Sequence, residues 1–217
     1  MRSLTRPQLL RSPTTQICDR PPREESHVTG PAGQTDARRR CGWAGSTPDY
    51  IDYHDNEWGR PVRDDKGLFE RLTLEAFQSG LSWLTILRKR ENFRTAFAGF
   101  EIAAVAAFTA DDRARLLADA GIVRNRAKID AAISNARAAL DVEAGLAELI
   151  WSFAPEAGPA PATLADIPAQ TAESQALSKE LKRRGFVFVG PVTAYALMQA
   201  TGIVDDHVKD CWVREGV

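Results

Sequence analysis

The chain has 217 residues, of which 44% are hydrophobic and 26% are charged, so it is long enough to bury a sizeable core. No run of about 18 apolar residues occurs, which argues against a membrane span. The three cysteines are few and odd in number, which argues against a disulfide framework. The formal net charge of −1 excludes no partner, because nucleic-acid binding depends on local clusters of charge.

Residues 1–40 differ in composition from the rest of the chain. They contain five of the twelve prolines and eight arginines against four acidic residues, so they carry a net +4 and residues 41–217 carry −5. We interpret residues 1–40 as a disordered basic extension and residues 41–217 as one domain; the alternative for the extension is a specific DNA-binding arm. No apolar stretch of signal-peptide length follows the N-terminal arginines, which favours a cytoplasmic protein.

Helical patterns fill most of residues 41–217. Residues of the capping type, Asp64, Ser82 and Thr109, precede three of the predicted helices. The predicted helices lie at 64–79, around 82–97, between 109 and 121, around 129–140 and 146–150, and at 173–184 and 191–201. Residues 154–170, rich in Pro and Ala, are predicted to form a loop, and no stretch longer than 186–189 alternates like a strand. The predicted fold class is therefore all-α.

Two cysteines and two histidines lie near the two ends of this domain. His207 and Cys211 are four residues apart, so they would share one face of a helix, and Cys41 and His54 are 13 apart, a spacing that can close a loop around a shared ion. A closed set of two Cys and two His is typical of structural zinc, because catalytic zinc keeps a position open for water. The alternative is a set of buried, hydrogen-bonded core residues without a metal.

A glycine-containing hairpin is predicted at 185–190, between the last two helices. It leads into a helix that begins with Pro191, and the free N–H groups and positive dipole end at such an N-terminus can bind a phosphate. Four basic residues precede the hairpin and would add positive charge: Lys179, Lys182, Arg183 and Arg184. The alternative is an ordinary corner between two helices with a solvated basic face.

Glu75 is an unusual residue on the largely apolar helix predicted at 64–79. A carboxylate there is usually solvated or paired with an arginine. However, the surrounding chain is dense in aromatic residues, namely Trp43, Tyr50, Tyr53, Trp58, Phe69, Phe77 and Trp83. A buried carboxylate ringed by aromatic side chains would suit a flipped, positively charged base, held by stacking and by a charge-assisted hydrogen bond.

Longer motifs extend these observations. They are CGW at 41–43, YIDYHDNEWG at 50–59, LEAFQSGLSW at 74–83, KRENF at 89–93, DAGIVRNRAKI at 119–129, WSF at 151–153, ALSKELKRRGFVFVG at 176–190 and DDHVKDC at 205–211. Together they resemble the bacterial constitutive DNA-3-methyladenine glycosylases of type I, in the helix-hairpin-helix superfamily. The resemblance covers residues 41 to about 211 and leaves residues 1–40 unexplained.

The resemblance implies a helix-hairpin-helix DNA glycosylase fold and a role for each candidate residue. It implies a structural Zn²⁺ that joins the two ends of the domain through Cys41, His54, His207 and Cys211. It implies that Glu75 is the catalytic residue and that the excised base also contacts Tyr53, Trp83 and Trp43. It implies that the DNA backbone is held by Phe188, Val189, Gly190 and, at the start of the next helix, Thr193.

Two positions depart from the family's pattern. The family is generally regarded as lacking the dedicated aspartate of its superfamily and as relying on the lability of a cationic, N3-alkylated purine. Asp205 stands where the family often has Asn, which raises the possibility of a catalytic aspartate; the alternative is a cap or a partner for His207. Ala76 and Phe77 replace a more polar pair, a change that would reshape the pocket wall.

The predicted function is hydrolysis of the N-glycosidic bond of 3-methyladenine in alkylated duplex DNA, which leaves an abasic site and serves base-excision repair. No lysine suited to a Schiff base lies near the hairpin, so we expect a monofunctional glycosylase without lyase activity. We expect double-stranded DNA containing 3-methyladenine as the partner, no membrane, and a monomer. The alternatives are a zinc-stapled helix-hairpin-helix DNA-binding module without activity, and a glycosylase whose base preference is shifted through Phe77 and Asp205.

Overall fold

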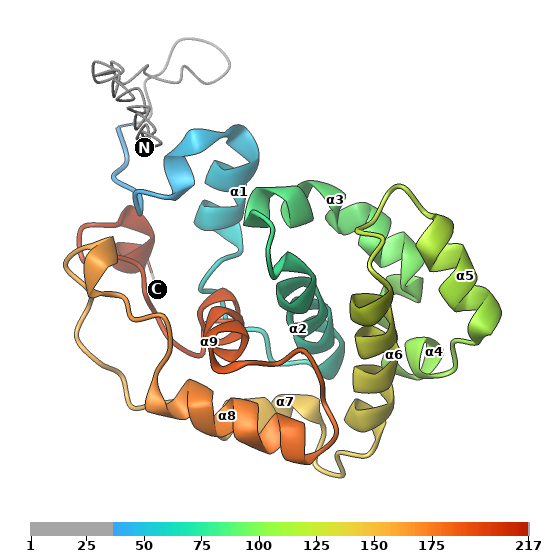
Figure 1. The fold of residues 1–217 in the computed structure, drawn as a ribbon. Coiled ribbons are helices and arrows are strands. Elements are labelled where there is room, and N and C mark those ends of the chain that lie inside the picture. The colour runs from blue at the N-terminus through green and yellow to red at the C-terminus, as the bar shows by residue number, and fades with distance from the viewer. Residues whose placement is uncertain (1–36, 217) are drawn as a thin grey trace, which may run out of the picture. The chain divides into compact units, whose positions relative to one another are not determined.

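The computed structural model describes residues 37–216, and the part of the chain from Arg38 onward forms a compact unit (Figure 1). Every regular element in the described residues is helical and none is a strand, which confirms the all-α prediction. No helix in this described range has the length and apolar character needed to cross a bilayer. The disordered extension predicted at 1–40 falls almost entirely on residues 1–36, which lie outside the described residues.

The described helices follow one another along the chain with short connections. They are α1 (Pro48–Asn56), α2 (Asp65–Gln78), α3 (Trp83–Ala96), α4 (Ile102–Ala106), α5 (Ala110–Ala118), α6 (Arg126–Leu140), α7 (Leu146–Trp151), α8 (Ala172–Arg183) and α9 (Pro191–Ala200). Short 3₁₀ turns add η1 (Ala44–Ser46), η2 (Ala98–Phe100), η3 (Leu164–Asp166) and η4 (Trp212–Gly216).

Three predicted caps are confirmed by hydrogen bonds. The Asp64 carboxylate accepts from the backbone N–H of Gly67 at 2.7 Å, the Ser82 hydroxyl accepts from that of Thr85 at 3.3 Å, and Thr109 forms a capping box with the helix that follows it. These bonds satisfy N–H groups that would otherwise lack partners at the helix start. The caps therefore fix where α2, α3 and α5 begin.

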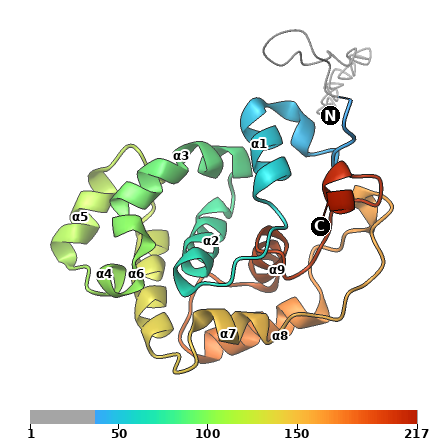
Figure 2. The ribbon, with the colours of Figure 1, turned by 180° about the vertical axis from the view of Figure 1, so that it is seen from behind.

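Helix α2 lies among the other helices of the compact unit that begins at Arg38 (Figures 1 and 2). It packs against α3, α6, α7 and α9. Its side chains Leu68, Phe69 and Leu72 are completely buried, and Phe77 packs edge-on against Phe93 of α3 with ring centroids 4.8 Å apart. A helix buried on most of its circumference has little room for a charged side chain, so Glu75 on α2 requires a specific explanation.

The chain near residue 40 and the chain near residue 212 lie side by side, as both views show (Figures 1 and 2). The Trp212 backbone N–H donates to the Arg39 carbonyl at 2.9 Å. The Arg40 guanidinium donates to both carboxylate oxygens of Asp55, at 2.8 and 2.7 Å. The first described residues therefore pack on the body of the domain.

One prediction about the local structure is wrong. His207 and Cys211 do not share a helix, because residues 205–208 have no regular secondary structure, residues 209–210 form a turn, and the 3₁₀ helix η4 begins only at Trp212. The Asp205 carboxylate accepts a hydrogen bond from the His207 backbone N–H at 3.1 Å, a local bond that competes with helix formation. The two side chains still converge, through this turn rather than through a helical face.

Candidate active site and metal centre

A cavity of about 360 Å³ opens beside Glu75. It is formed by α1, α2, the start of α3, α9 and the loop around η3. Its lining residues are Trp43, Tyr50, Tyr53, Trp58, Glu75, Gln78, Trp83, Leu164, Ile167, Ala196 and Gln199. The structure thus brings together all four residues predicted to surround a base, from three helices and an N-terminal turn. A largely apolar cavity of this size with a few polar groups is the usual form of a small-molecule site.

The Glu75 carboxylate is buried in the cavity wall without a partner. Its residue is 6% exposed, and no side chain among the described residues forms an ion pair or hydrogen bond with it. Arg71, one turn earlier on α2, pairs instead with Glu57 at 2.9 Å. Burial raises the pKa of Glu75 from about 4.5 to about 8, against an opposing effect of the nearby Arg71 charge. A solvated or arginine-paired Glu75 is therefore the wrong interpretation.

Aromatic rings form the other walls of the cavity. Tyr53 and Trp83 lie with ring centroids 5.4 Å apart, and Trp43 packs edge-on against Trp58 at 5.1 Å and against Tyr50 at 5.7 Å. Burial, with the nearby negative charge of Glu75, raises the pKa of Tyr53, so its phenol stays protonated. Flat walls and one carboxylate suit a planar, positively charged ligand.

The two positions that depart from the family pattern lie elsewhere. The Phe77 side chain is completely buried among Phe93 and Phe97 and does not line the cavity, so the prediction that it reshapes the pocket wall is wrong. Asp205 caps the His207 backbone and pairs with Arg214 at 3.1 Å. It does not line the cavity either, which agrees with its predicted alternative role as a cap.

The raised pKa of Glu75 predicts a pH-dependent stability. Between pH 4.5 and about 8 the folded state binds a proton that the unfolded state has lost, so this group makes the fold less stable as pH rises through that window. Glu75→Gln removes the dependence, and we expect the variant to gain melting temperature over the wild type at about pH 9 but not at about pH 4. Glu143→Gln, at an exposed position, is the matched control and should shift neither value. Equal shifts at both pH values would contradict the burial of a chargeable Glu75.

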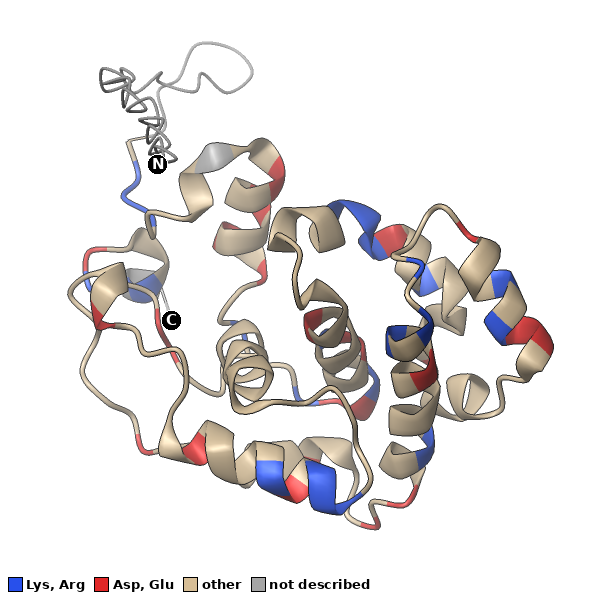
Figure 3. Cartoon of the chain, in the orientation of Figure 1, with Lys and Arg blue, Asp and Glu red and all other residues tan. Residues whose placement is uncertain are grey.

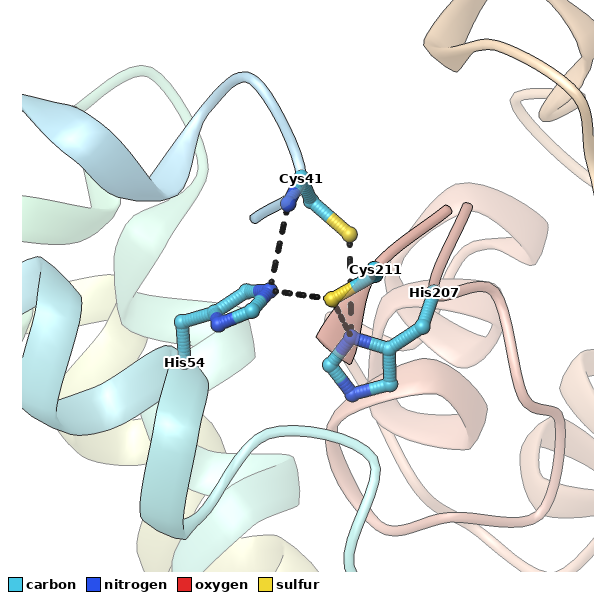
Figure 4. A group of neighbouring side chains, drawn as sticks. All are labelled: Cys41, His54, His207 and Cys211. Carbon is cyan, nitrogen blue, oxygen red and sulfur yellow. Dashed lines mark hydrogen bonds between the residues drawn. The ribbon is translucent and has the colours of Figure 1, made fainter. Parts of the chain in front are cut away.

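The second cluster consists of Cys41, His54, His207 and Cys211, all buried (Figure 4). Their four ligand atoms all lie within 4.8 Å of one another. Individual sulfur–nitrogen distances are 3.4 Å from Cys211 to His54, 3.5 Å from Cys211 to His207 and 3.6 Å from Cys41 to His207. In a tetrahedron with Zn–S of about 2.3 Å and Zn–N of about 2.05 Å, sulfur and nitrogen lie about 3.5 Å apart. The cluster could therefore hold a metal ion.

Neighbouring groups orient the two histidine rings. His54 Nδ1 lies 2.8 Å from an Asp55 carboxylate oxygen, and His207 Nε2 lies 3.2 Å from the Trp58 carbonyl. These acceptors favour ring protons on the outer nitrogens, so the inner nitrogens can act as ligands, although His54 Nε2 also accepts from the Cys41 backbone N–H at 3.4 Å. Burial raises the pKa of the Cys41 thiol to about 12 and lowers that of His207 to about 4. A Cys41 thiolate would therefore need a cation beside it.

The metal cluster and the cavity share a wall. Trp58 lines the cavity and packs edge-on against the His207 ring at 4.7 Å, while Trp43 also lines it and packs against the His54 ring at 5.2 Å. On α1, Tyr53 belongs to the cavity and the next residue, His54, belongs to the cluster. The histidine rings of the cluster therefore pack against two of the tryptophans that form the cavity wall.

The predicted hairpin connects α8 to α9. Phe188 has a positive φ of 58° and is 44% exposed, whereas the Val189 side chain is buried, so Val189 can reach a ligand only through its backbone. Gly190 is the N-cap of α9 and offers no side-chain cap, and a Cβ built on it would meet no atom within 4 Å. Thr193 follows in the first turn of α9 and is half-buried.

Basic residues gather toward the end of α8 beside this turn (Figure 3). Only part of the predicted positive charge is available, because Arg183 and Arg184 both pair with Glu180, at 2.6 and 2.7 Å. Lys179 and Lys182 are exposed.

Several cavity residues carried no assigned role in the sequence. Tyr50 and Trp58 belong to the aromatic-rich stretch, and Gln78 lies one turn after Glu75 on α2, so helical spacing was an available signal for it. Gln199 and the loop residues Leu164 and Ile167 come from distant parts of the chain. No local pattern places them beside Glu75.

Comparison with known proteins gives a consistent result. The methyladenine glycosylase family model matches residues 43–215. A relative from Escherichia coli (strain K12), DNA-3-methyladenine glycosylase 1, is 51% identical over 183 residues, which cover 82% of this chain and 97% of the relative. A crystal structure of 3-methyladenine DNA glycosylase I shares the fold with a TM-score of 0.77 and 47% identity, covering 80% of this chain and 98% of that one. A substituted 3-methyladenine DNA glycosylase I in complex with 3-methyladenine matches with a TM-score of 0.76 and 36% identity, covering 80% and 96%. The chain belongs to the methyladenine glycosylase family.

Proposed function

We propose that this member of the methyladenine glycosylase family releases 3-methyladenine from alkylated duplex DNA by hydrolysing its N-glycosidic bond. The observation that carries the proposal is the unpaired, buried Glu75 carboxylate in an aromatic cavity of about 360 Å³. The relatives named above supply the substrate class, since they are named for 3-methyladenine and one is described with that base bound. Measurement of free 3-methyladenine released from methylated duplex DNA tests the proposal.

The charge of the damaged base explains how such a cavity can promote its release. An N3-alkylated adenine in DNA is cationic, and it becomes a neutral leaving group when the glycosidic bond breaks. A flipped cationic base would stabilise the charged form of Glu75, offset the burial that raises its pKa, and pack against the aromatic wall that includes Tyr53 and Trp83. A normal adenine, which is neutral, would leave the carboxylate without a counter-charge, so the cavity favours the damaged base.

The residues around the cavity support a monofunctional enzyme. A glycosylase that also cuts the strand uses an amine to form a covalent Schiff base. None of the residues that line the cavity is a lysine. We therefore propose hydrolysis that leaves an intact strand with an abasic site, cleaved only after treatment with alkali. We further propose a monomer that acts in the cytoplasm, where a bacterial repair enzyme meets its DNA.

We propose that zinc is the ion that Cys41, His54, His207 and Cys211 hold. Two sulfur and two imidazole ligands, at the separations of a tetrahedral site, favour zinc and leave no position for water. When bound, zinc supplies a structural link between the two ends of the domain rather than a reacting group. The chain's own residues do the chemistry in the neighbouring cavity.

The turn from α8 to α9 is proposed to be the helix-hairpin-helix element that grips the DNA backbone. Backbone N–H groups at Gly190 and in the first turn of α9 face a position without a side-chain cap, and the α9 dipole favours a phosphate there. Such contacts hold DNA without reading its sequence, which suits an enzyme that must search all DNA.

Gly190→Ala tests this contact. The backbone at Gly190 has a φ of −75° and open space around the new Cβ, so the variant should fold, with a stability within about 1 kcal/mol of wild type because alanine is a poorer N-cap than glycine. The added methyl group would stand where the phosphate approaches, and loss of one charge-assisted hydrogen bond of about 1.5–3 kcal/mol would weaken DNA binding about 10- to 100-fold. Fluorescence anisotropy with duplex DNA measures the effect, and Gly158→Ala, also in open space, is the control. Unchanged affinity in Gly190→Ala would remove this turn from the DNA interface.

Two other functions are less well supported. A DNA-binding module without activity would have no need of an unpaired, buried carboxylate in a cavity, which costs stability. A base preference shifted through Phe77 and Asp205 would require that these residues touch the base, and neither lines the cavity.

A further inference from the structure

Gln199 is a polar residue of the cavity that the proposed mechanism leaves without a role. It lies on α9, across the cavity from the aromatic residues of α1, and is half-buried. Its side-chain amide can face the cavity either with its oxygen, which accepts a hydrogen bond, or with its NH₂ group, which donates one. Which of the two faces the base decides which chemical groups the cavity recognises.

A hydrogen-bonded chain behind the cavity fixes the orientation of this amide. Gln199 Nε2 donates to Asp206 Oδ2 at 2.8 Å, and the Tyr195 hydroxyl donates to the same oxygen at 2.6 Å. An ionised carboxylate can only accept hydrogen bonds, so the nitrogen of the Gln199 amide has to be on the Asp206 side. Gln199 and Tyr195 are four residues apart on α9, hence on the same face of the helix, and Tyr195 is 4% exposed.

The amide oxygen is consequently left for a ligand. No donor among the described residues forms a hydrogen bond with Gln199 Oε1. Asp206 and Tyr195 line a separate cavity and not the one beside Glu75, so we expect them to act on the base site through Gln199. The Gln199 oxygen is therefore available as a hydrogen-bond acceptor in the same cavity as the Glu75 carboxylate.

We propose that Gln199 is a specificity-determining residue whose amide oxygen accepts a hydrogen bond from the exocyclic amine of the bound base, with Asp206 and Tyr195 as positioning residues. The proposal rests on the proposed function and deepens it. Adenine carries an amine at its six-position, whereas guanine carries a carbonyl oxygen there. A guanine-type base would bring oxygen against oxygen and leave the buried acceptor unpaired, the arrangement by which polar sites reject analogues most strongly.

The test compares release of two bases, 3-methyladenine and 3-methylguanine, from methylated duplex DNA that contains both. Gln199→Leu is expected to lower kcat/KM for 3-methyladenine about tenfold and to raise that for 3-methylguanine, because the adenine derivative loses a hydrogen bond and the guanine derivative no longer meets an opposing oxygen. Asp206→Asn frees the amide to turn, since an asparagine can donate as well as accept, and is expected to lower the selectivity for 3-methyladenine about fivefold. Tyr195→Phe is also expected to lower the selectivity for 3-methyladenine, but by a smaller factor.

The controls separate the possible failures. Asp141→Asn makes the same chemical change at an exposed position at the end of α6 and should keep wild-type selectivity. If Gln199→Leu and Asp206→Asn lower release of both bases by the same factor, the residues are only structural and the inference is overturned. If the wild type releases no 3-methyladenine, the proposed function fails first, and that result is distinct from an active enzyme whose selectivity does not change.

Discussion

Replacing Glu75 by glutamine is expected to lower kcat/KM for 3-methyladenine release about 10- to 100-fold. The variant keeps the shape of the side chain but loses the negative charge that a cationic base would meet in the cavity. A hydrogen bond to a charged group contributes about 1.5–3 kcal/mol, and each 1.4 kcal/mol corresponds to a factor of about ten. Because the carboxylate is the form that binds a cation, the wild-type rate should also rise with pH toward about 8, and Glu75→Gln should lose that rise.

The comparison needs a variant that tests charge alone. Glu143→Gln removes an exposed carboxylate and should retain full activity. Binding of methylated duplex DNA by Glu75→Gln should remain within about threefold of wild type, because most of the affinity comes from backbone contacts outside the cavity. If Glu75→Gln releases 3-methyladenine at the wild-type rate, Glu75 has no part in the reaction.

Removing both thiolates of the metal cluster is expected to have the largest effect on stability. The double variant Cys41→Ser/Cys211→Ser should no longer hold the zinc ion proposed for this cluster, and the two histidines would remain buried without an ion. Binding of structural zinc is worth about 10–16 kcal/mol in small domains, and losing even about 4 kcal/mol would lower the melting temperature by about 8–16 °C in a protein of this size. Metal analysis and calorimetry of the same preparation measure both quantities.

Cys18→Ser serves as the control, since the proposed ligand set does not include the third cysteine. The double variant should also bind the base more weakly. Trp43 and Trp58 line the cavity and pack on the histidine rings of the cluster, so loss of the ion would disturb the cavity wall. Zinc at one ion per chain in the double variant would rule out the cluster as the metal site.

The sequence predicts the helices better than it predicts how the ends of the domain are built. Caps at Asp64, Ser82 and Thr109 depend on local hydrogen bonds within three residues, so a local pattern identifies them. The same kind of reasoning fails for His207 and Cys211, because a spacing of four is compatible with a turn as well as a helix. The turn is stabilised by Asp205 and by Arg214, which donates to the His207 carbonyl at 2.7 Å.

The candidate site also combines residues that a local sequence pattern identifies with residues that no local pattern identifies. Glu75 can be recognised from the sequence because a carboxylate on a largely apolar helix is unusual. The aromatic residues before it can be recognised because they are dense in that stretch of the chain. Helix α1 was not predicted, although Thr47 caps it and Pro48 begins it, since its own side chains are largely polar and lack a clear apolar period. Gln199 lies in the cavity only because α9 packs against α2. These two helices are more than a hundred positions apart in the sequence, so no local pattern predicts their contact.

Release of the free base from methylated duplex DNA by the purified wild-type protein tests the central claim most directly. The account predicts that 3-methyladenine appears as the free base, that the DNA strand stays intact until alkali is added, and that Glu75→Gln slows the release about 10- to 100-fold. Release of no 3-methyladenine by a folded, zinc-loaded wild-type protein would contradict it.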